Sequence, residues 1–320
     1  MTRAYGMMRE VLISALQALS RHAAMVLAVG VFAGLVLPDL AGWMRPLLPS
    51  AVAGLLFLAL LRIDWQELSR HLSRPLIVAL LCAWFLIATP VLMWAAVELF
   101  AVEKGLATAL ILAAACPPIV SGPAMALLLR LDAPLMLVSV AGASLLVPVT
   151  VVAVSPHLIG VDLRIDAFEL FLRLAFLIGG CVLTAVIARR LLGQARLLRC
   201  KNAFDITSVM LLLVFAVAIM DGVTVLVAQA PWHVLGFILA AFVANMLLQL
   251  LGTGVTAAMG RRSALTVGFA SGNRNMGLLL AVLPADSAPD VLLFFALGQL
   301  PIYILPVVLG PAYRRWLSGA

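Results

Sequence analysis

Apolar segments long enough to cross a bilayer follow one another along almost the whole chain, separated by short polar connections. A helix needs roughly 20 residues to cross a hydrocarbon core of ~30 Å. Hydrophobic residues make up 65% of the 320 residues and charged residues only 11%, whereas a soluble domain is about 45–50% apolar. These features predict an all-α polytopic membrane protein.

The segments predict ten transmembrane spans, and the charges of the connections support this count. The spans are expected near residues 22–38, 46–61, 75–98, 105–129, 133–155, 167–188, 204–229, 231–256, 263–283 and 289–313. Basic connections alternate with connections that are not basic, and a missed or spurious span would break this alternation. The positive-inside rule then places both termini in the cytoplasm, and we expect the protein in the cytoplasmic (inner) membrane.

Several classes of function find no support in the sequence. The net charge is +7, but no basic patch is interleaved with aromatic residues, so nucleic acid is not an expected partner. No CxxC pair, HExxH motif, nucleotide loop or Ser/His arrangement within a span is present. We therefore expect neither an enzyme nor a bound metal or cofactor. The four cysteines are interpreted as apolar thiols: Cys82, Cys116, Cys181 and Cys200.

The ten spans divide into two halves, residues 1–160 and 161–320, of five spans each. An odd number of spans per half inverts the second half in the membrane. The fourth span contains Cys116-Pro-Pro-Ile-Val-Ser-Gly-Pro123, and its counterpart, the ninth, contains Ser271-Gly-Asn-Arg-Asn275. Interruptions at matching positions of two halves are typical of a binding site formed by discontinuous helices.

The chemistry of these two stretches predicts that both helices are broken. Proline has no N–H group and clashes with the preceding turn, so an unbroken helix cannot accommodate the prolines of the fourth span. An arginine near the expected midplane must face water, a ligand or another buried charge. The candidate substrate-binding residues are Arg274, Asn275, Asn273, Gly272, Ser121, Gly122 and Pro117. The alternative for Arg274 is pairing with a structural carboxylate. The alternative for the prolines is a kink that only shapes helix packing.

Other polar residues within the spans are candidates for coupling or for lining a cavity: Asp221, Asn245, Gln249, Thr253 and Gln299. Asn245, Gln249 and Thr253 are four residues apart and share one helix face. Their alternative role is interhelical hydrogen bonding. For Asp221 three roles are open: pairing with Arg274, titration as a proton site, or contact with the outer interface.

The motifs resemble those of the bile acid:sodium symporter family. In that family the fourth span contains Cys-Pro-Gly-Gly, and the ninth contains Glu-x-Gly-x-Gln-Asn-x-x-Leu. Cys116-Pro117 matches the first motif, and Gly272, Asn275 and Leu278 match the spacing of the second. The resemblance implies a panel of spans 1, 2, 6 and 7 and a core of spans 3–5 and 8–10, with crossed helices 4 and 9.

The sequence departs from the family at the positions that supply sodium ligands. The fourth-span Ser-Asn positions are Gly122 and Pro123, and the fifth-span hydroxyl positions are Met136 and Val140. The ninth-span Glu and Gln positions are Ala270 and Arg274, and the third-span Gln position falls near Phe85. The resemblance therefore implies the scaffold without its sodium sites. Arg274, which is always protonated, would substitute for the cation or anchor an anion.

The function that we predict is secondary transport of a small, anionic organic solute by alternating access, in a lipid bilayer and without sodium. Two alternatives are an arsenite-type efflux carrier, for which Cys116 is present but the acidic partner is missing, and a membrane sensor or scaffold that moves no solute. The sequence leaves the solute, the direction of flux and the oligomeric state open.

Overall fold

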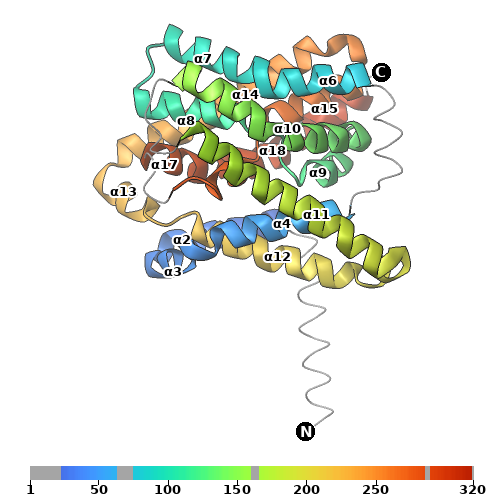
Figure 1. Ribbon diagram of the computed structural model, residues 1–320. Helices are drawn as coiled ribbons and strands as arrows, with labels where there is room; N and C mark the ends of the chain where they lie inside the picture. Colours follow the sequence, from blue (N-terminus) through green and yellow to red (C-terminus); the bar gives the residue numbers. More distant parts are fainter. Residues whose placement is uncertain (1–22, 63–74, 160–165, 285–288, 319–320) are drawn as a thin grey trace. The chain divides into compact units, whose positions relative to one another are not determined.

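The computed structural model describes residues 23–62, 75–159, 166–284 and 289–318, and these residues fold into helices (Figure 1). The described residues form no β-strand, and their one β-bridge is isolated. The all-α prediction is thus confirmed for these ranges. The predicted basic head of the chain and the 62–75 and 156–166 connections lie wholly or partly outside them.

The described residues belong to two compact units, Met1–Arg62 with Gly179–Gln229, and Ile63–Ile178 with Ala230–Ala320. The first unit contains α2 (Ala23–Val36), α3 (Pro38–Met44), η1 (Arg45–Leu47), α4 (Leu48–Arg62), the second half of α11 (Ala167–Arg199), α12 (Lys201–Ala218) and α13 (Val223–Gln229). Gly30 and Gly34 bring α2 close to α12, since a Cβ atom at Gly34 would lie 2.7 Å from the carbonyl oxygen of Val217. Small residues at such contacts are typical of helix pairs in membranes.

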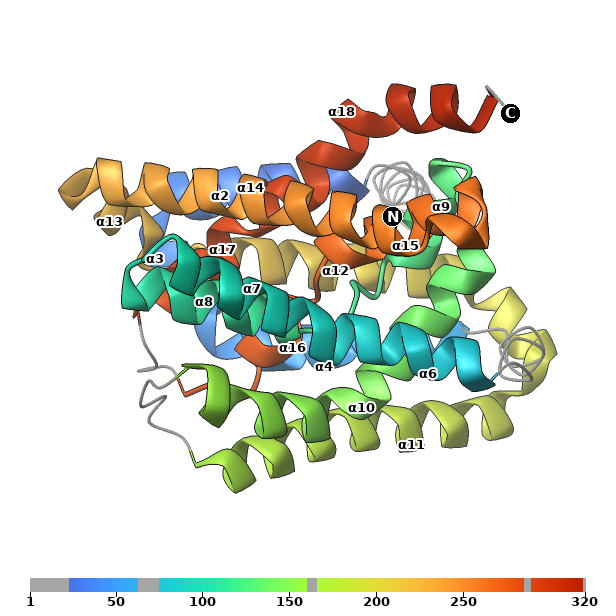
Figure 2. The ribbon, with the colours of Figure 1, turned by 90° about the horizontal axis from the view of Figure 1, so that it is seen from above.

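The second unit contains the two stretches that the sequence marks as broken. Its helices are α6 (Pro75–Ala83), η2 (Trp84–Ala88), α7 (Thr89–Leu99), α8 (Lys104–Ala115), α9 (Gly122–Leu128), α10 (Ala133–Ile159), the start of α11, α14 (Pro231–Val255), η3 (Ala257–Met259), α15 (Arg261–Gly272), α16 (Met276–Leu280), α17 (Pro289–Leu297) and α18 (Gln299–Ser318). One π-helical turn, η2, joins α6 to α7, and the two run on in nearly one line (Figure 2).

Seven helices of the described residues are long and apolar enough to cross a membrane: Pro38–Arg62, Pro75–Leu99, Ala133–Ala153, Phe168–Leu197, Lys201–Gln229, Pro231–Val255 and Pro289–Ser318. They correspond to predicted spans 2, 3, 5, 6, 7, 8 and 10. The other three predicted spans contain shorter helices. The first begins outside the described residues and continues as the 14-residue α2, and the fourth and ninth are interrupted.

Prolines and glycines set many of the helix ends. Pro38, Pro231 and Pro289 lie at the first turns of their helices, where a missing N–H costs no hydrogen bond. Gly260 has a φ angle of 89° and directly precedes α15. Gly193, with a φ angle of 68°, kinks α11 in its basic C-terminal part. Both angles are in the region that favours glycine.

Candidate functional site at two interrupted helices

The two interruptions meet in the second unit, where their backbones pair. Pro118 and Arg274 form an antiparallel β-bridge. The backbone N–H of Ile119 donates to the carbonyl oxygen of Asn273 at 2.9 Å, and that of Asn275 donates to the carbonyl oxygen of Pro117 at 2.8 Å. The extended segments between α8 and α9 and between α15 and α16 therefore supply hydrogen-bond partners for each other's backbone. Non-helical backbone inside a membrane protein requires such partners.

The end of α8 lacks backbone donors because two prolines follow its C-cap residue, Cys116. In an uninterrupted helix, the carbonyl groups of Ala113 and Ala114 would accept hydrogen bonds from residues 117 and 118, but prolines have no N–H. The N–H of Cys116 instead donates to the carbonyl oxygen of Ala113 at 3.2 Å. The hydroxyl of Thr89 lies 3.1 Å from the carbonyl oxygen of Ala114 and can donate to it. A side chain of another helix thus helps to cap α8.

The π-helical turn η2 leaves a further carbonyl group without a backbone donor. The N–H of Thr89 donates to the carbonyl oxygen of Trp84 rather than to that of Phe85. The next residue that could reach the carbonyl group of Phe85 is Pro90, which has no N–H. This carbonyl group faces the crossing, the place where segments 116–121 and 273–275 pair. It accepts from Arg274 at 3.1 Å and lies 2.8 Å from the Thr89 hydroxyl, which can donate to it or to Ala114. A π-helical turn inside a helix often marks a functional site.

The guanidinium group of Arg274 binds the oxygen atoms that these interruptions leave free. Its Nε donates to the carbonyl oxygen of Ser271 at 2.7 Å, and its Nη1 donates to those of Phe85 at 3.1 Å and Cys116 at 2.9 Å. Its Nη2 donates to the hydroxyl of Thr89 at 2.5 Å. Cζ lies 5.5 Å from the centroid of the Phe85 ring. The side chain is 2% exposed. Four of its five N–H groups have acceptors within the protein.

Dipoles of the described residues offset part of the charge of Arg274. Among the residues that the structure describes, no acidic side chain forms an ion pair with Arg274. Helices α8 and α15 both end at the crossing, and a helix C-terminus carries roughly half a negative charge. The carbonyl groups that bind the guanidinium include those of Cys116, at the end of α8, and Ser271, in the last turn of α15.

One role that the sequence left open for Asp221 is pairing with Arg274, and the ion pair described for Asp221 is not with Arg274. In the first unit, Oδ2 of Asp221 lies 3.9 Å from Nη1 of Arg45. The Asp221 side chain is 38% exposed in this contact. Its contact is therefore with another arginine, at the turn between α12 and α13, and the proton-site role stays a prediction.

Asn245 and Gln249 connect the ninth-span interruption to the last helix. Nδ2 of Asn245 donates to the carbonyl oxygen of Gly272 at 2.8 Å, and Nε2 of Gln249 donates to Oδ1 of Asn245 at 2.6 Å. The hydroxyl of Tyr313, in α18, donates to Oε1 of Gln249 at 2.5 Å. This geometry favours the hydrogen-bonding role for both amides, although Asn245 also lines a cavity.

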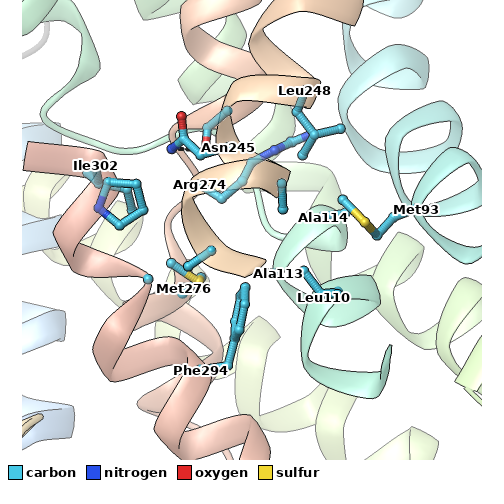
Figure 3. A pocket seen from close by; sticks show the side chains of 15 residues that line it. Met93, Leu110, Ala113, Ala114, Asn245, Leu248, Arg274, Met276, Phe294 and Ile302 are labelled. Atoms are coloured by element: carbon cyan, nitrogen blue, oxygen red, sulfur yellow. Dashed lines mark hydrogen bonds between the residues drawn. The ribbon is translucent and has the colours of Figure 1, made fainter. Parts of the chain in front are cut away.

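A small apolar cavity adjoins the crossing (Figure 3). Its volume is about 30 Å³, enough for about two water molecules. Arg274 lies between Asn245 and Ala114 in this view, and methionines and aromatic or aliphatic side chains complete the lining. In this conformation the cavity is too small for an organic solute.

The other candidate residues lie in the second unit but differ in their surroundings. Asn273 is fully buried, and its Oδ1 has no hydrogen-bond partner. Ser121 is exposed, with its hydroxyl 3.8 Å from the sulfur of Met125. Thr253 donates to the carbonyl oxygen of Gln249 within α14, and Gln299, at the start of α18, donates to that of Phe295 in α17. Neither Thr253 nor Gln299 forms a described hydrogen bond with Arg274.

Sequence reasoning did not find the residues that complete the crossing, Thr89, Trp84 and Tyr313. Thr89 directly precedes Pro90, and this pair in the middle of an apolar span was the available signal. Nε1 of Trp84 donates to the hydroxyl of Ser271 at 2.8 Å. Tyr313 lies near the chain end, where its polar partner in α14 could not be inferred from spacing.

The fold and the crossing define a class, that of polytopic membrane proteins with paired, interrupted helices. Comparison with family models gives the particular family: the model of the Sodium Bile acid symporter family matches residues 49–230, more than half of the chain. The chain belongs to this family. No curated protein matches the chain. The matched region includes the first interruption and ends before the second, where the sequence departs most from the family motif.

Proposed function

We propose that the protein is a secondary transporter that carries a small organic anion across the cytoplasmic membrane by alternating access. The observation that supports this most strongly is the pair of interrupted helices whose backbones cross at Pro118 and Arg274. Interrupted helices within a bilayer are typical of transporter substrate sites. Membership of a symporter family supports the same class and argues against an enzyme.

The full architecture that we propose is ten spans in two inverted repeats, with both termini in the cytoplasm. Within the described ranges, seven helices are long and apolar enough to cross a membrane. The two interrupted pairs, α8 with α9 and α15 with α16, and the shorter α2 would supply the other three spans. The corresponding interruptions at residues 116–121 and 273–275 support the repeat.

We propose further that transport does not use sodium, because side chains fill the positions that the family resemblance equates with ion ligands. A Cβ atom at Gly122 would lie 1.9 Å from Cε of Met136, so the methionine packs where a fourth-span serine would project. Ala270 is fully buried and has no side-chain oxygen. Arg274 and Phe85, the two glutamine positions, are in direct contact.

The permanent charge of Arg274 supports an anionic solute, although the geometry limits how it could act. Four guanidinium N–H groups already have acceptors. In this conformation Arg274 therefore cannot form a bidentate pair of hydrogen bonds with a carboxylate. We propose that Arg274 attracts the solute through its electrostatic field. The family description names bile acids, which are amphipathic carboxylates.

Thermal unfolding of the purified protein with a panel of organic acids, in sodium and in choline buffers, tests the proposal. We expect at least one acid to raise Tm equally in both buffers and to be carried into proteoliposomes. Binding without flux would contradict transport and favour the sensor or scaffold. A rise in Tm that requires sodium would contradict sodium independence.

A further inference from the structure

We propose that the crossing is a buried cation-binding site whose cation is part of the chain, the guanidinium group of Arg274. The assignment deepens the proposed function, and rests on it only for the consequence for ion coupling.

The ligand set at the crossing consists of oxygen atoms alone. Three backbone carbonyl oxygens and one hydroxyl oxygen lie 2.5–3.1 Å from guanidinium nitrogens. Hard cations such as sodium and potassium bind oxygen ligands, and rings of backbone carbonyl groups can replace their water shell. The oxygens that hold Arg274 are thus of the kind that hold a free cation.

These oxygen atoms are available because the sequence withholds their backbone donors. Pro90 cannot donate to Phe85, and the N–H of Asn275, which would serve Ser271 in a continuous helix, donates to Pro117. Without the guanidinium, the carbonyl group of Ser271 would be left unpaired at membrane depth, and that of Phe85 would keep only the Thr89 hydroxyl. Unpaired buried carbonyl groups are costly.

The charge of the site also favours a cation. The C-termini of α8 and α15 carry partial negative charge, which offsets part of the positive charge of Arg274. Among the described residues no carboxylate pairs with Arg274, so these dipoles are its partners. Removal of the guanidinium would therefore leave a negative, oxygen-lined space that favours a mobile cation.

The consequence is that the site is permanently occupied. A tethered cation cannot dissociate, so no ion gradient can drive the carrier through this site. The wild-type protein should then respond equally to alkali cations and to a cation too large for the site, such as choline.

The experiment is thermal unfolding of purified Arg274→Ala and Arg274→Gln in sodium, potassium, choline and low millimolar guanidinium chloride at constant ionic strength. We expect a lowered Tm that sodium or guanidinium partly restores relative to choline, and no such restoration in the wild type. Arg262→Ala is the matched control. It removes an arginine of the same helix that donates to a backbone carbonyl oxygen, that of Leu131 at 3.0 Å.

Two results would overturn the proposal: neutral variants of Arg274 that fold but respond equally to all cations, and a wild-type protein that sodium stabilises over choline. Arg274→Lys keeps the charge and covers the case of poor folding. It should give more folded protein than Arg274→Gln, and equal yields would contradict a charge-based role. Absence of solute flux, in contrast, would count against the transporter and leave the cation result standing.

Discussion

Thr89 and Arg274 show how single residues stabilise an interrupted helix. The Thr89 hydroxyl lies within hydrogen-bonding distance of two carbonyl oxygens, those of Phe85 and Ala114, and accepts from Arg274. It is fully buried. One hydroxyl thus contacts the end of α8, the π-helical turn and the guanidinium group at once.

We predict that Thr89→Val, which keeps the shape of the side chain and removes the hydroxyl, destabilises the protein by about 1–3 kcal/mol. This is the range expected when a buried polar group loses its partner. Thr89→Ser keeps the hydroxyl and should lose less. Equal losses in the two variants, measured by unfolding in detergent, would show that the methyl group, and not the hydroxyl, matters.

At the scale of elements, α14 and α15 pack tightly against each other in the second unit. A Cβ atom at Gly268 would lie 2.0 Å from the hydroxyl oxygen of Thr253 and 2.5 Å from the carbonyl oxygen of Gln249. At Gly272 it would lie 2.5 Å from the carbonyl oxygen of Asn245. Since Gly272 is the last residue of α15, this packing holds the end of α15 against α14.

Gly268→Ala should therefore separate α14 from α15 and destabilise the protein by about 1–3 kcal/mol, as overpacking of a tight contact does. Gly236→Ala, in α14, is the control because a Cβ atom there meets no atom within 4 Å. We expect unfolding in detergent to show a loss only for the first variant. A similar loss in both would mean that the contact has no special role.

The sequence predicted the interruptions better than it predicted the partners that complete them. Pro117 and Pro118 required a break on steric grounds, and the break lies there. The partner of Arg274 could not be inferred, because backbone carbonyl groups leave no trace in a residue pattern. A carboxylate was one expected partner, whereas the acceptors are three carbonyl oxygens and Thr89. The π-helical turn that frees one of them likewise has no reliable pattern.

At the scale of the whole molecule, the chain combines the scaffold of a sodium-coupled family with a site that carries its own charge. The family model matches residues 49–230, and the departures at Ala270 and Arg274 lie beyond this region. We infer that such a change would separate transport from the sodium gradient while the crossed helices keep their geometry.

The most direct test of this account is uptake of a stabilising organic acid into proteoliposomes, with external sodium replaced by choline at constant ionic strength and membrane potential. Because Arg274 occupies the cation site permanently, we predict the same initial rate in both salts. Ala270→Glu with Arg274→Gln, which restores two family residues, should fall in rate when sodium is replaced. Wild-type uptake that requires sodium would contradict the account.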